Sequence, residues 1–332
     1  MDKRHRFGEF SSTSRMAVVI LLMTSACSTQ SNRDAVPKNE VASRIVFVNR
    51  PDLKLGFTTQ NFIESLPVDL EHAKELVRYA AQHGCHWIEY RDPNAELTLA
   101  DCREIAAFAR AQGIEIAYAN QRSLIDSDFW EIFEKGVVNA AVFEGPHTIR
   151  AVLSGELLEA DAEKKGFTKD ELDQLVATAE RAAKMAKEHG LQLVIENGLE
   201  AFAGDGETIY GYREFFDAVS EAVNCQPDTG NFFCAARIPA SPEQAKKFLD
   251  DNIERTSYIH LKSSVDHEFQ AVLTDNALDF DYVFDLLASH QVPYIAIELV
   301  PAENADQAYK NHEASVEYLK RSGHVISEKK TP

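Results

Sequence analysis

The feature that most constrains this chain is a regular alternation of short apolar runs with amphipathic helical segments from residue 53 onward. The runs are four to six residues long and are bounded by polar residues, glycine or proline, which is typical of strands buried on both faces. Eight such strands are predicted, at Lys54–Thr58, His86–Tyr90, Glu115–Ala119, Val138–Phe143, Gln192–Glu196, Val223–Pro227, Tyr258–Leu261 and Tyr294–Glu298.

Helices are predicted between these strands, and the clearest is Thr168–His189. Leucine and alanine recur there at helical spacing, and Thr168 with Glu171 forms a capping box. The others are predicted at Leu70–Gln82, Ala100–Gln112, Asp126–Lys135, Ile209–Ala222, Pro242–Glu254, Phe280–Ser289 and Ala305–Arg321. Eight strand–helix units in roughly 270 residues predict an α/β fold, a single (β/α)8 TIM barrel. A doubly wound sheet is the alternative, but the chain has no GxGxxG or P-loop sequence.

The amino-terminal residues follow a different pattern. Four basic residues precede the apolar run Met16–Met23, and Thr24-Ser25-Ala26-Cys27 follows it. This pattern predicts a secretory signal peptide, because the run is shorter than the roughly 20 residues of a membrane-spanning helix. Ser-Ala-Cys resembles a bacterial lipobox, which predicts lipidation of Cys27 and a periplasmic protein that contacts the membrane only through its lipid anchor. Cleavage after Ala26 without lipidation is the alternative.

The predicted domain organisation is therefore simple. Residues 1–26 form the signal peptide, 27–50 a flexible polar tether, 51–325 the barrel and 326–332 a tail. The formal net charge of −19 argues against nucleic acid as a partner, because such a partner requires a basic surface that displaces counterions. The sequence does not indicate an oligomeric state.

Four potential metal ligands stand at the ends of the last four predicted strands. Glu196, Asp228, His260 and Glu298 are separated by 32, 32 and 38 residues, close to one strand–helix unit each. The carboxyl ends of barrel strands meet on one face, where the active sites of such barrels lie. Three carboxylates and one imidazole predict one divalent metal ion, Mn²⁺ or Mg²⁺ in the first place, with Co²⁺, Zn²⁺ or Fe²⁺ also compatible.

Other polar residues lie near the predicted strand ends. Lys262 follows His260 by two residues, so strand alternation places both side chains on the same face. The residues predicted to line a substrate pocket are Lys262, Asn231, Glu144, Glu89 and Asn120.

The motifs Val-Ile-Glu-Asn, Asp-Thr-Gly-Asn, Ile-His-Leu-Lys and Ile-Ala-Ile-Glu, in this order, resemble the xylose isomerase-like TIM barrel superfamily, which includes the sugar phosphate isomerase/epimerase family. The resemblance covers residue 53 to about residue 321. It implies that the four residues are the metal ligands and that Glu196 and Glu298 are also the catalytic acid/base pair. The implied activity is a metal-dependent sugar isomerase or epimerase that acts through an enediolate on a small sugar.

Two positions differ from the ketose 3-epimerases of that superfamily, which carry a histidine where this chain has Asn231 and an arginine where it has Asp266. Alternatives therefore stay open: a metal-dependent lyase, dehydratase or hydrolase that acts on keto-glycosides or cyclitols, or a non-catalytic sugar-binding lipoprotein. The predicted export favours a non-phosphorylated sugar or keto-sugar, because phosphorylated sugars are chiefly cytoplasmic.

Overall fold

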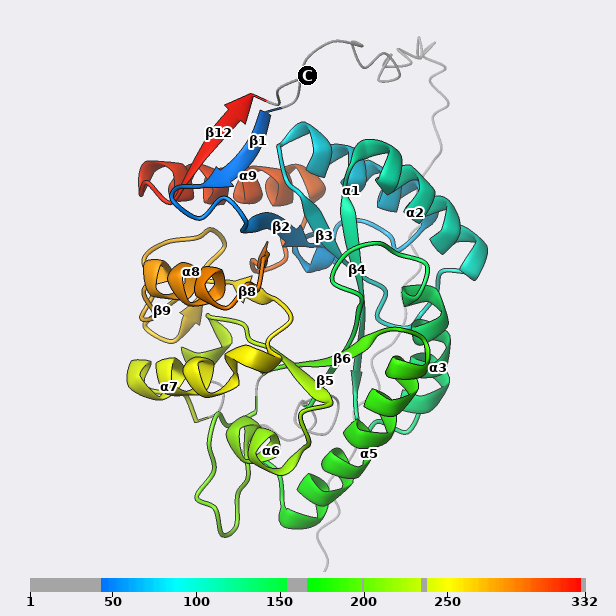
Figure 1. Cartoon of the computed structure of the whole chain (residues 1–332), viewed down its shortest axis with the longest axis vertical. Coiled ribbons are helices and arrows are strands. Elements are labelled where there is room, and N and C mark those ends of the chain that lie inside the picture. Colours follow the sequence, from blue (N-terminus) through cyan, green and yellow to red (C-terminus); the bar gives the residue numbers. More distant parts are fainter. Residues whose placement is uncertain (1–42, 154–165, 199, 234–237, 330–332) are drawn as a thin grey trace, which may run out of the picture. The chain divides into compact units, whose positions relative to one another are not determined.

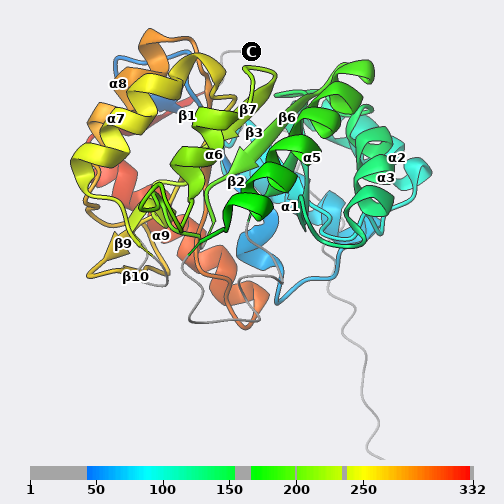
Figure 2. The same ribbon diagram turned by 90° about the horizontal axis from the view of Figure 1, so that it is seen from below.

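The computed structural model describes residues 43–153, 166–198, 200–233 and 238–329. Eight parallel strands form a nearly closed barrel, and helices surround it (Figures 1 and 2). The predicted (β/α)8 barrel is therefore confirmed. Its strands are β2 (Lys54–Thr58), β3 (Trp87–Arg91), β4 (Glu115–Ser123), β5 (Thr148–Val152), β6 (Gln192–Glu196), β7 (Val223–Gln226), β8 (Ile259–Leu261) and β11 (Tyr294–Ile297).

The order of the strands explains how distant residues meet. Hydrogen bonding runs β7-β6-β5-β4-β3-β2-β11-β8, so the last strand of the barrel pairs with the first. Single bridges close the seam between β7 and β8, one of them pairing Asp228 with His260. The backbone N–H of His260 donates to the oxygen of Pro227 at 2.9 Å, and that of Thr229 donates to the oxygen of His260 at 3.0 Å. Two predicted metal ligands thus become neighbours at the seam.

The helices begin where the sequence offers capping side chains. Thr98, Thr168 and Ser241 cap α2, α5 and α7, each in a capping box. Among the described residues no helix has the length and apolar character to cross a membrane. The helices are α1 (Leu70–Gln82), α2 (Leu99–Gln112), α3 (Phe129–Ala140), α5 (Lys169–Glu188), α6 (Tyr212–Ala218), α7 (Pro242–Asn252), α8 (Phe280–Ser289) and α9 (Ala305–Arg321), with short 3-10 turns at η1 (Thr59–Phe62), η2 (Asn231–Phe233) and η3 (Ile253–Arg255).

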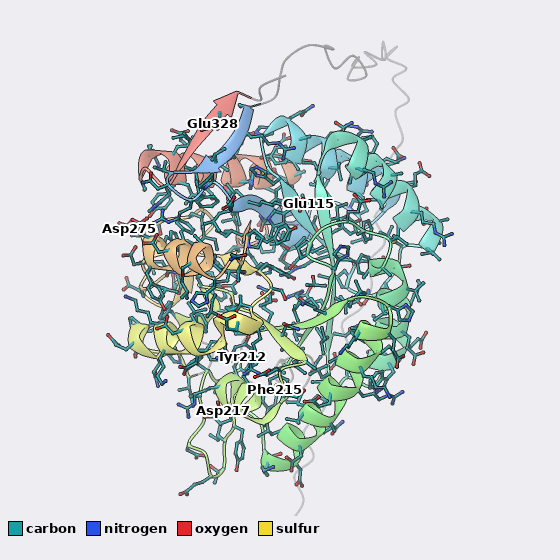
Figure 3. All side chains as sticks on the ribbon, in the orientation of Figure 1. Glu115, Tyr212, Phe215, Asp217, Asp275 and Glu328 are labelled. Atoms are coloured by element: carbon teal, nitrogen blue, oxygen red, sulfur yellow. The ribbon has the colours of Figure 1, made fainter. Side chains whose placement is uncertain are left out.

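The half of the barrel interior nearer the amino-terminal ends of the strands is packed with side chains. Trp87 and Tyr258 are fully buried there, with their ring centroids 5.4 Å apart, together with Ala117, Val194 and Ala296. At the amino-terminal end of the barrel, Glu115 accepts hydrogen bonds from Lys54 Nζ and Tyr294 Oη, both at 2.7 Å (Figure 3). These side chains fill the amino-terminal end of the barrel interior, and the four predicted metal ligands lie toward the opposite end.

The predicted fourth strand, Val138–Phe143, is wrong. Residues up to Ala140 belong to α3, where Phe133 and Val137 are buried at helical spacing while Val138 is exposed. The real strand is β5, whose sequence Thr-Ile-Arg-Ala-Val contains the fully buried Arg150. Arg150, in the middle of β5, interrupts the apolar run by which buried strands are recognised. The prediction therefore placed this strand too early in the sequence, at Val138–Phe143.

The ends of the barrel region also differ from the prediction. Within the predicted tether, β1 (Ser43–Phe47) pairs antiparallel with β12 (Val325–Lys329), which includes most of the predicted tail. The side chains of Ile45, Phe47 and Val325, which belong to this two-stranded sheet, are buried. The backbone N–H of Ile45 donates to the oxygen of Gly84, just before β3, so the sheet lies at the amino-terminal end of the barrel (Figure 1). The predicted signal peptide and the predicted lipidation site Cys27 lie outside the described residues.

A two-stranded hairpin follows β8. Its strands are β9 (Ser264–Val265) and β10 (Glu268–Phe269), and the turn residues Asp266 and His267 have positive φ angles of 51° and 67°. His267 Nδ1 lies 2.8 Å from the oxygen of Phe233, which joins the hairpin to η2. Asp266 is exposed at this turn.

Candidate metal centre

The four predicted ligands converge at the carboxyl end of the barrel. Glu196 ends β6, Asp228 follows β7, His260 lies in β8 and Glu298 follows β11. All four side chains are buried, and each offers one ligand atom within 4.8 Å of the others. The strand order β6-β7-β8-β11 therefore turns four separate strand ends into one cluster.

The two carboxylate oxygens of Asp228 differ: one accepts two hydrogen bonds, and the other accepts none from the described residues. Its Oδ1 accepts the backbone N–H groups of Gly230 and Asn231 at 2.8 and 2.9 Å. Its Oδ2 is buried and accepts no hydrogen bond from the described residues, with Lys262 Nζ 3.7 Å away. An unpaired buried oxygen is costly unless an ion or water satisfies it. This oxygen is therefore suited to bind a cation.

His260 presents its two ring nitrogens to different carboxylates. Nδ1 faces the cluster, 3.0 Å from Glu196 Oε1 and 2.9 Å from Glu298 Oε2. Nε2 points the other way and lies 2.8 Å from Oε2 of Glu89, on β3. Burial lowers the pKa of His260, but Glu89 and Glu298 outweigh burial and raise it overall.

Three buried cations surround the carboxylates. Arg91 donates from Nε to Glu89 at 2.9 Å and from Nη2 to Glu298 at 2.6 Å. Lys262 donates to Glu298 at 3.0 Å and to Asn231 at 3.2 Å. Arg150 forms an ion pair with Glu196, although its guanidinium makes no hydrogen bond of good geometry. These cations offset the desolvation cost of grouping ionised carboxylates inside the barrel.

The cations and burial act differently on the individual carboxylates. Burial raises the pKa of Asp228; Lys262 opposes this rise, while Glu298 adds to it. Burial also favours protonation of Glu298, but Arg91 and Lys262 hold the pKa of Glu298 well below its usual range. Glu298 is consequently ionised at neutral pH and available as a ligand or as a base.

The residues present fit one divalent cation. The donors are carboxylate oxygens with a single imidazole nitrogen, and Asp228 Oδ2 accepts no hydrogen bond from the described residues that would compete with a cation. Oxygen-rich sets of this kind suit Mn²⁺ and Mg²⁺, and one imidazole also admits Zn²⁺, Co²⁺ or Fe²⁺. Nε2 of His260, which points away from the cluster, lies at hydrogen-bond distance from the carboxylate of Glu89, as is usual for metal-binding histidines.

Residues 77–322 match the family described as xylose isomerase-like TIM barrel. The chain belongs to this family. Comparison of the sequence with curated proteins finds no match.

Solved structures share the fold of this family member at low sequence identity. A D-psicose 3-epimerase from Clostridium cellulolyticum H10, solved with D-tagatose, has a TM-score of 0.60 and 13% identity, covering 82% of this chain and 100% of its own. A D-allulose 3-epimerase from Methylomonas sp. in complex with D-allulose has a TM-score of 0.60 and 15% identity, covering 84% and 99%. A xylose isomerase-like TIM barrel protein from Mycobacterium smegmatis in complex with magnesium has a TM-score of 0.58 and 16% identity, covering 81% and 97%.

The structure of this family member brings three of the five predicted substrate-pocket residues to the cluster. Lys262 donates a hydrogen bond to Asn231 there, and Glu89 contacts His260. Asn120 instead packs against α3, where a Cβ at Gly136 would overlap its side chain. Glu144 is exposed before β5 and pairs with Arg110 at 2.7 Å. Neither of these two lies with the cluster, because strand alternation turns Asn120 outward and the fourth strand begins after Glu144.

Sequence reasoning missed two cationic members of the site. Arg91 follows Glu89 by two residues on β3, so extending the predicted strand by one residue would have placed both on the inner face. Arg150 lies in the strand that was not predicted, and no local sequence signal marks it as buried.

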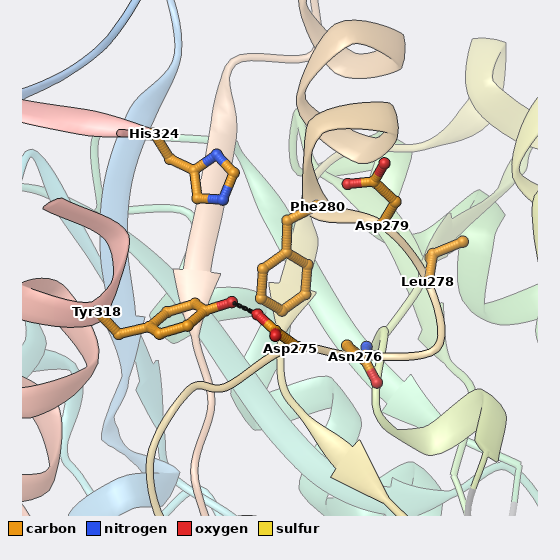
Figure 4. A pocket seen from close by; sticks show the side chains of 7 residues that line it. All are labelled: Asp275, Asn276, Leu278, Asp279, Phe280, Tyr318 and His324. Carbon is orange, nitrogen blue, oxygen red and sulfur yellow. Dashed lines mark hydrogen bonds between the residues drawn. The ribbon is translucent and has the colours of Figure 1, made fainter. Parts of the chain in front are cut away.

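A pocket of about 250 Å³ lies between the start of α8 and the end of α9 (Figure 4). Inside it, Tyr318 Oη donates to Asp275 at 2.7 Å. The Nδ2 of Asn276 donates to the backbone oxygen of Lys262 at 3.2 Å, so this region supports the segment after β8 that carries Lys262. None of the four clustered residues lines the pocket, whose lining residues are Asp275, Asn276, Leu278, Asp279, Phe280, Tyr318 and His324.

Proposed function

We propose that the protein is a divalent-metal-dependent sugar isomerase or epimerase that acts through an enediolate on a non-phosphorylated sugar or keto-sugar. The observation that carries this proposal is the buried cluster of three carboxylates and one imidazole, in which Asp228 Oδ2 accepts no hydrogen bond from the described residues. When bound, a divalent cation polarises the substrate carbonyl and stabilises the negative charge of the enediolate.

Glu196 and Glu298 are the proposed acid and base. They extend from β6 and from the end of β11, the two strands that flank β7 and β8, and both approach His260 Nδ1. A substrate carbon held between them is reached by two carboxylates. Removal of its proton by one and return by the other inverts the carbon, which is epimerisation, and return to the neighbouring carbon is isomerisation.

Two buried cations orient the carboxylate of Glu298, the proposed base. Arg91 and Lys262 contact different oxygens of Glu298, Oε2 at 2.6 Å and Oε1 at 3.0 Å, which fixes the plane of the carboxylate. Lys262 also bonds Asn231, so its ammonium group lies where negative charge develops on a bound sugar. Asn231 stands where the ketose 3-epimerases carry a histidine in the resemblance, whereas Asp266, at the position of their arginine, is exposed in the hairpin turn.

The substrate class rests on two observations. The predicted export signal favours a free sugar over a phosphorylated one. Two structural neighbours are a D-psicose and a D-allulose 3-epimerase, and their solved complexes hold D-tagatose and D-allulose. These support ketoses as the first compounds to test.

The decisive experiment is hydrogen exchange in D₂O with the Mn²⁺-loaded protein. D-fructose, D-tagatose, D-allulose and a 3-keto-glycoside are incubated separately, and deuterium at carbon is followed by NMR while the metal content is measured by elemental analysis. We expect deuterium in one of these sugars, lost in Glu298→Gln and retained in Glu144→Gln, a matched change at an exposed glutamate. Exchange that survives in Glu298→Gln would remove Glu298 from the acid/base role, and no metal in the purified or Mn²⁺-treated protein would reject the proposal.

A lyase acting on a keto-glycoside or cyclitol is the second candidate, and Lys262 favours it. Elimination requires a proton donor for the leaving group in addition to the base, and the Lys262 ammonium lies 3.0 Å from Glu298. The same incubations distinguish the two reactions, because a lyase releases the aglycone or water and an epimerase returns an isomeric sugar of unchanged mass apart from deuterium.

We also propose that the protein is exported and anchored by a lipid on Cys27. The support is the basic, apolar and small-residue order of the first 27 residues. Labelling of the full chain with a radioactive fatty acid in a bacterial host tests it. Label is expected in the wild type and absent from Cys27→Ser; label retained by Cys27→Ser contradicts lipidation at this residue.

A further inference from the structure

We propose that Glu89 is a positioning residue that fixes which ring nitrogen of His260 faces the metal site. This inference rests on the proposed metal dependence. It changes the role expected from the sequence, where Glu89 was a residue for the substrate pocket. The structure offers Glu89 little access to a substrate, because the side chain is fully buried on the inner face of β3.

Both carboxylate oxygens of Glu89 are engaged by donors. Oε2 accepts from Tyr258 Oη at 2.6 Å and lies 2.8 Å from His260 Nε2. Oε1 accepts from Thr58 Oγ1 at 3.0 Å and from Arg91 Nε at 2.9 Å. An ionised carboxylate has only acceptor sites, so the ring nitrogen beside it must carry a hydrogen.

This contact decides the form of the imidazole once a cation occupies the cluster. Before that, both ring nitrogens face carboxylates; a cation takes the place of a hydrogen on Nδ1, whereas Nε2 keeps its hydrogen against Glu89. A neutral histidine carries one N–H, and a hydrogen on Nε2 leaves the lone pair on Nδ1. Nδ1 is the atom that faces Glu196 and Glu298, and it lies 3.9 Å from Asp228 Oδ2. Metal binding requires that lone pair, since a hydrogen on Nδ1 would point at the cation. Glu89 therefore prepares His260 as a ligand from the far side of the ring.

Arg91 determines what a substitution at Glu89 does. In Glu89→Gln an amide NH₂ group replaces one carboxylate oxygen. Whether it takes the place of Oε1 or of Oε2, it faces groups that donate hydrogen bonds in the wild type. The charged guanidinium of Arg91 is the stronger claimant for the remaining oxygen, because charge-assisted hydrogen bonds are about twice as strong as neutral ones. The NH₂ group then faces His260 Nε2, which becomes an acceptor, and the hydrogen moves to Nδ1.

The test measures Mn²⁺ affinity by calorimetry in the full chain. We expect Glu89→Gln to raise the Kd about 10- to 100-fold, the range seen for partners that orient metal-binding histidines. The matched control is Thr58→Val, which removes a hydrogen bond from the other oxygen of Glu89 and leaves the contact with His260. Its Kd is expected to stay within about threefold, well short of that range.

A spectroscopic readout reports the position of the hydrogen directly. In the Mg²⁺-loaded wild type, the Nε2–H of His260 is buried against Glu89, so we expect a slowly exchanging ¹H–¹⁵N signal that is missing in His260→Gln. Its absence from the folded wild type overturns the inference without any variant, which covers the case in which Glu89→Gln does not fold.

The outcomes separate this inference from the proposed function. If the wild type binds neither Mn²⁺ nor Mg²⁺, the proposed function fails first. If the wild type binds Mn²⁺ and Glu89→Gln binds it equally well, only the inference is overturned. An equal loss of affinity in Thr58→Val and Glu89→Gln also overturns it, because general packing around Glu89 then explains the effect.

Discussion

Replacing Arg91 by methionine tests whether buried cations hold the barrel together around the candidate site. Arg91 is 2% exposed, and its Nη2 contacts Glu298 at 2.6 Å while its Nε contacts Glu89 at 2.9 Å. Arg110 offers a comparison on the surface, because it contacts Glu144 at nearly the same distance, 2.7 Å, with both side chains more than half exposed. The two arginines therefore differ in burial and in the number of carboxylates they contact, which is two at short distance for Arg91 and one for Arg110.

The expected costs follow from that difference. Removing one partner of a buried pair leaves an uncompensated charge and costs about 3–5 kcal/mol, whereas an exposed pair contributes about 0–1 kcal/mol. In a domain of this size 1 kcal/mol corresponds to roughly 2–4 °C in Tm. Arg91→Met should therefore lower the Tm by roughly 6–20 °C, and Arg110→Met by at most about 4 °C.

Thermal unfolding followed by circular dichroism measures both variants, in a chelator and with excess Mn²⁺. We expect Mn²⁺ to recover part of the loss in Arg91→Met, because Glu298 then regains a cationic partner. The reasoning is refuted if Arg91→Met costs no more than Arg110→Met in the chelator. Such a result would mean that Glu298 and Glu89 take up protons or water when Arg91 is absent.

Three further predictions follow from other contacts. Asp228→Asn should abolish the thermal stabilisation by Mn²⁺, which at 100 times the Kd amounts to about 2.7 kcal/mol in the wild type; an undiminished shift would move the metal away from Asp228. Burial lowers the pKa of His312 from 6.5 to about 3, so the unfolded chain takes up a proton first as the pH falls. Stability present above pH 6.5 is then lost toward pH 3, by about 2 kcal/mol at pH 5, and urea titrations of His312→Gln should show a loss smaller by that amount; parallel curves would contradict this. Gly136→Ala should destabilise the protein by about 1–3 kcal/mol through overlap with Asn120, and urea denaturation indistinguishable from wild type would show that the helix yields freely.

The barrel and the four clustered residues could be predicted because both are expressed locally in the sequence. Glu196 and Glu298 stand where the apolar runs of β6 and β11 end, and Asp228 follows the short strand β7 and Pro227. Their spacing repeats with the strand–helix unit, and the barrel geometry then brings equivalent strand ends to one face. Periodicity and topology were sufficient for this part of the site.

The buried arginines could not be predicted in the same way. A charged residue is expected at the surface, since burial is affordable only with partners. The partners of Arg91 and Arg150 include Glu298 and Glu196, which lie 207 and 46 residues further along the chain. Local pattern holds no information about such contacts, and for Arg150 the same charge concealed the strand itself.

The missed cations also alter how the site is understood. Glu89, Glu196, Asp228 and Glu298 would be too costly to bury together as bare anions. Arg91, Arg150 and Lys262 supply compensating charge from within the chain. The same contacts compete with a metal ion, because a cation entering the cluster must share Glu298 with Arg91 and Lys262. If the cluster binds a metal as proposed, we expect its affinity to depend on the balance between the two arginines, the lysine and the ion as well as on the four proposed ligands.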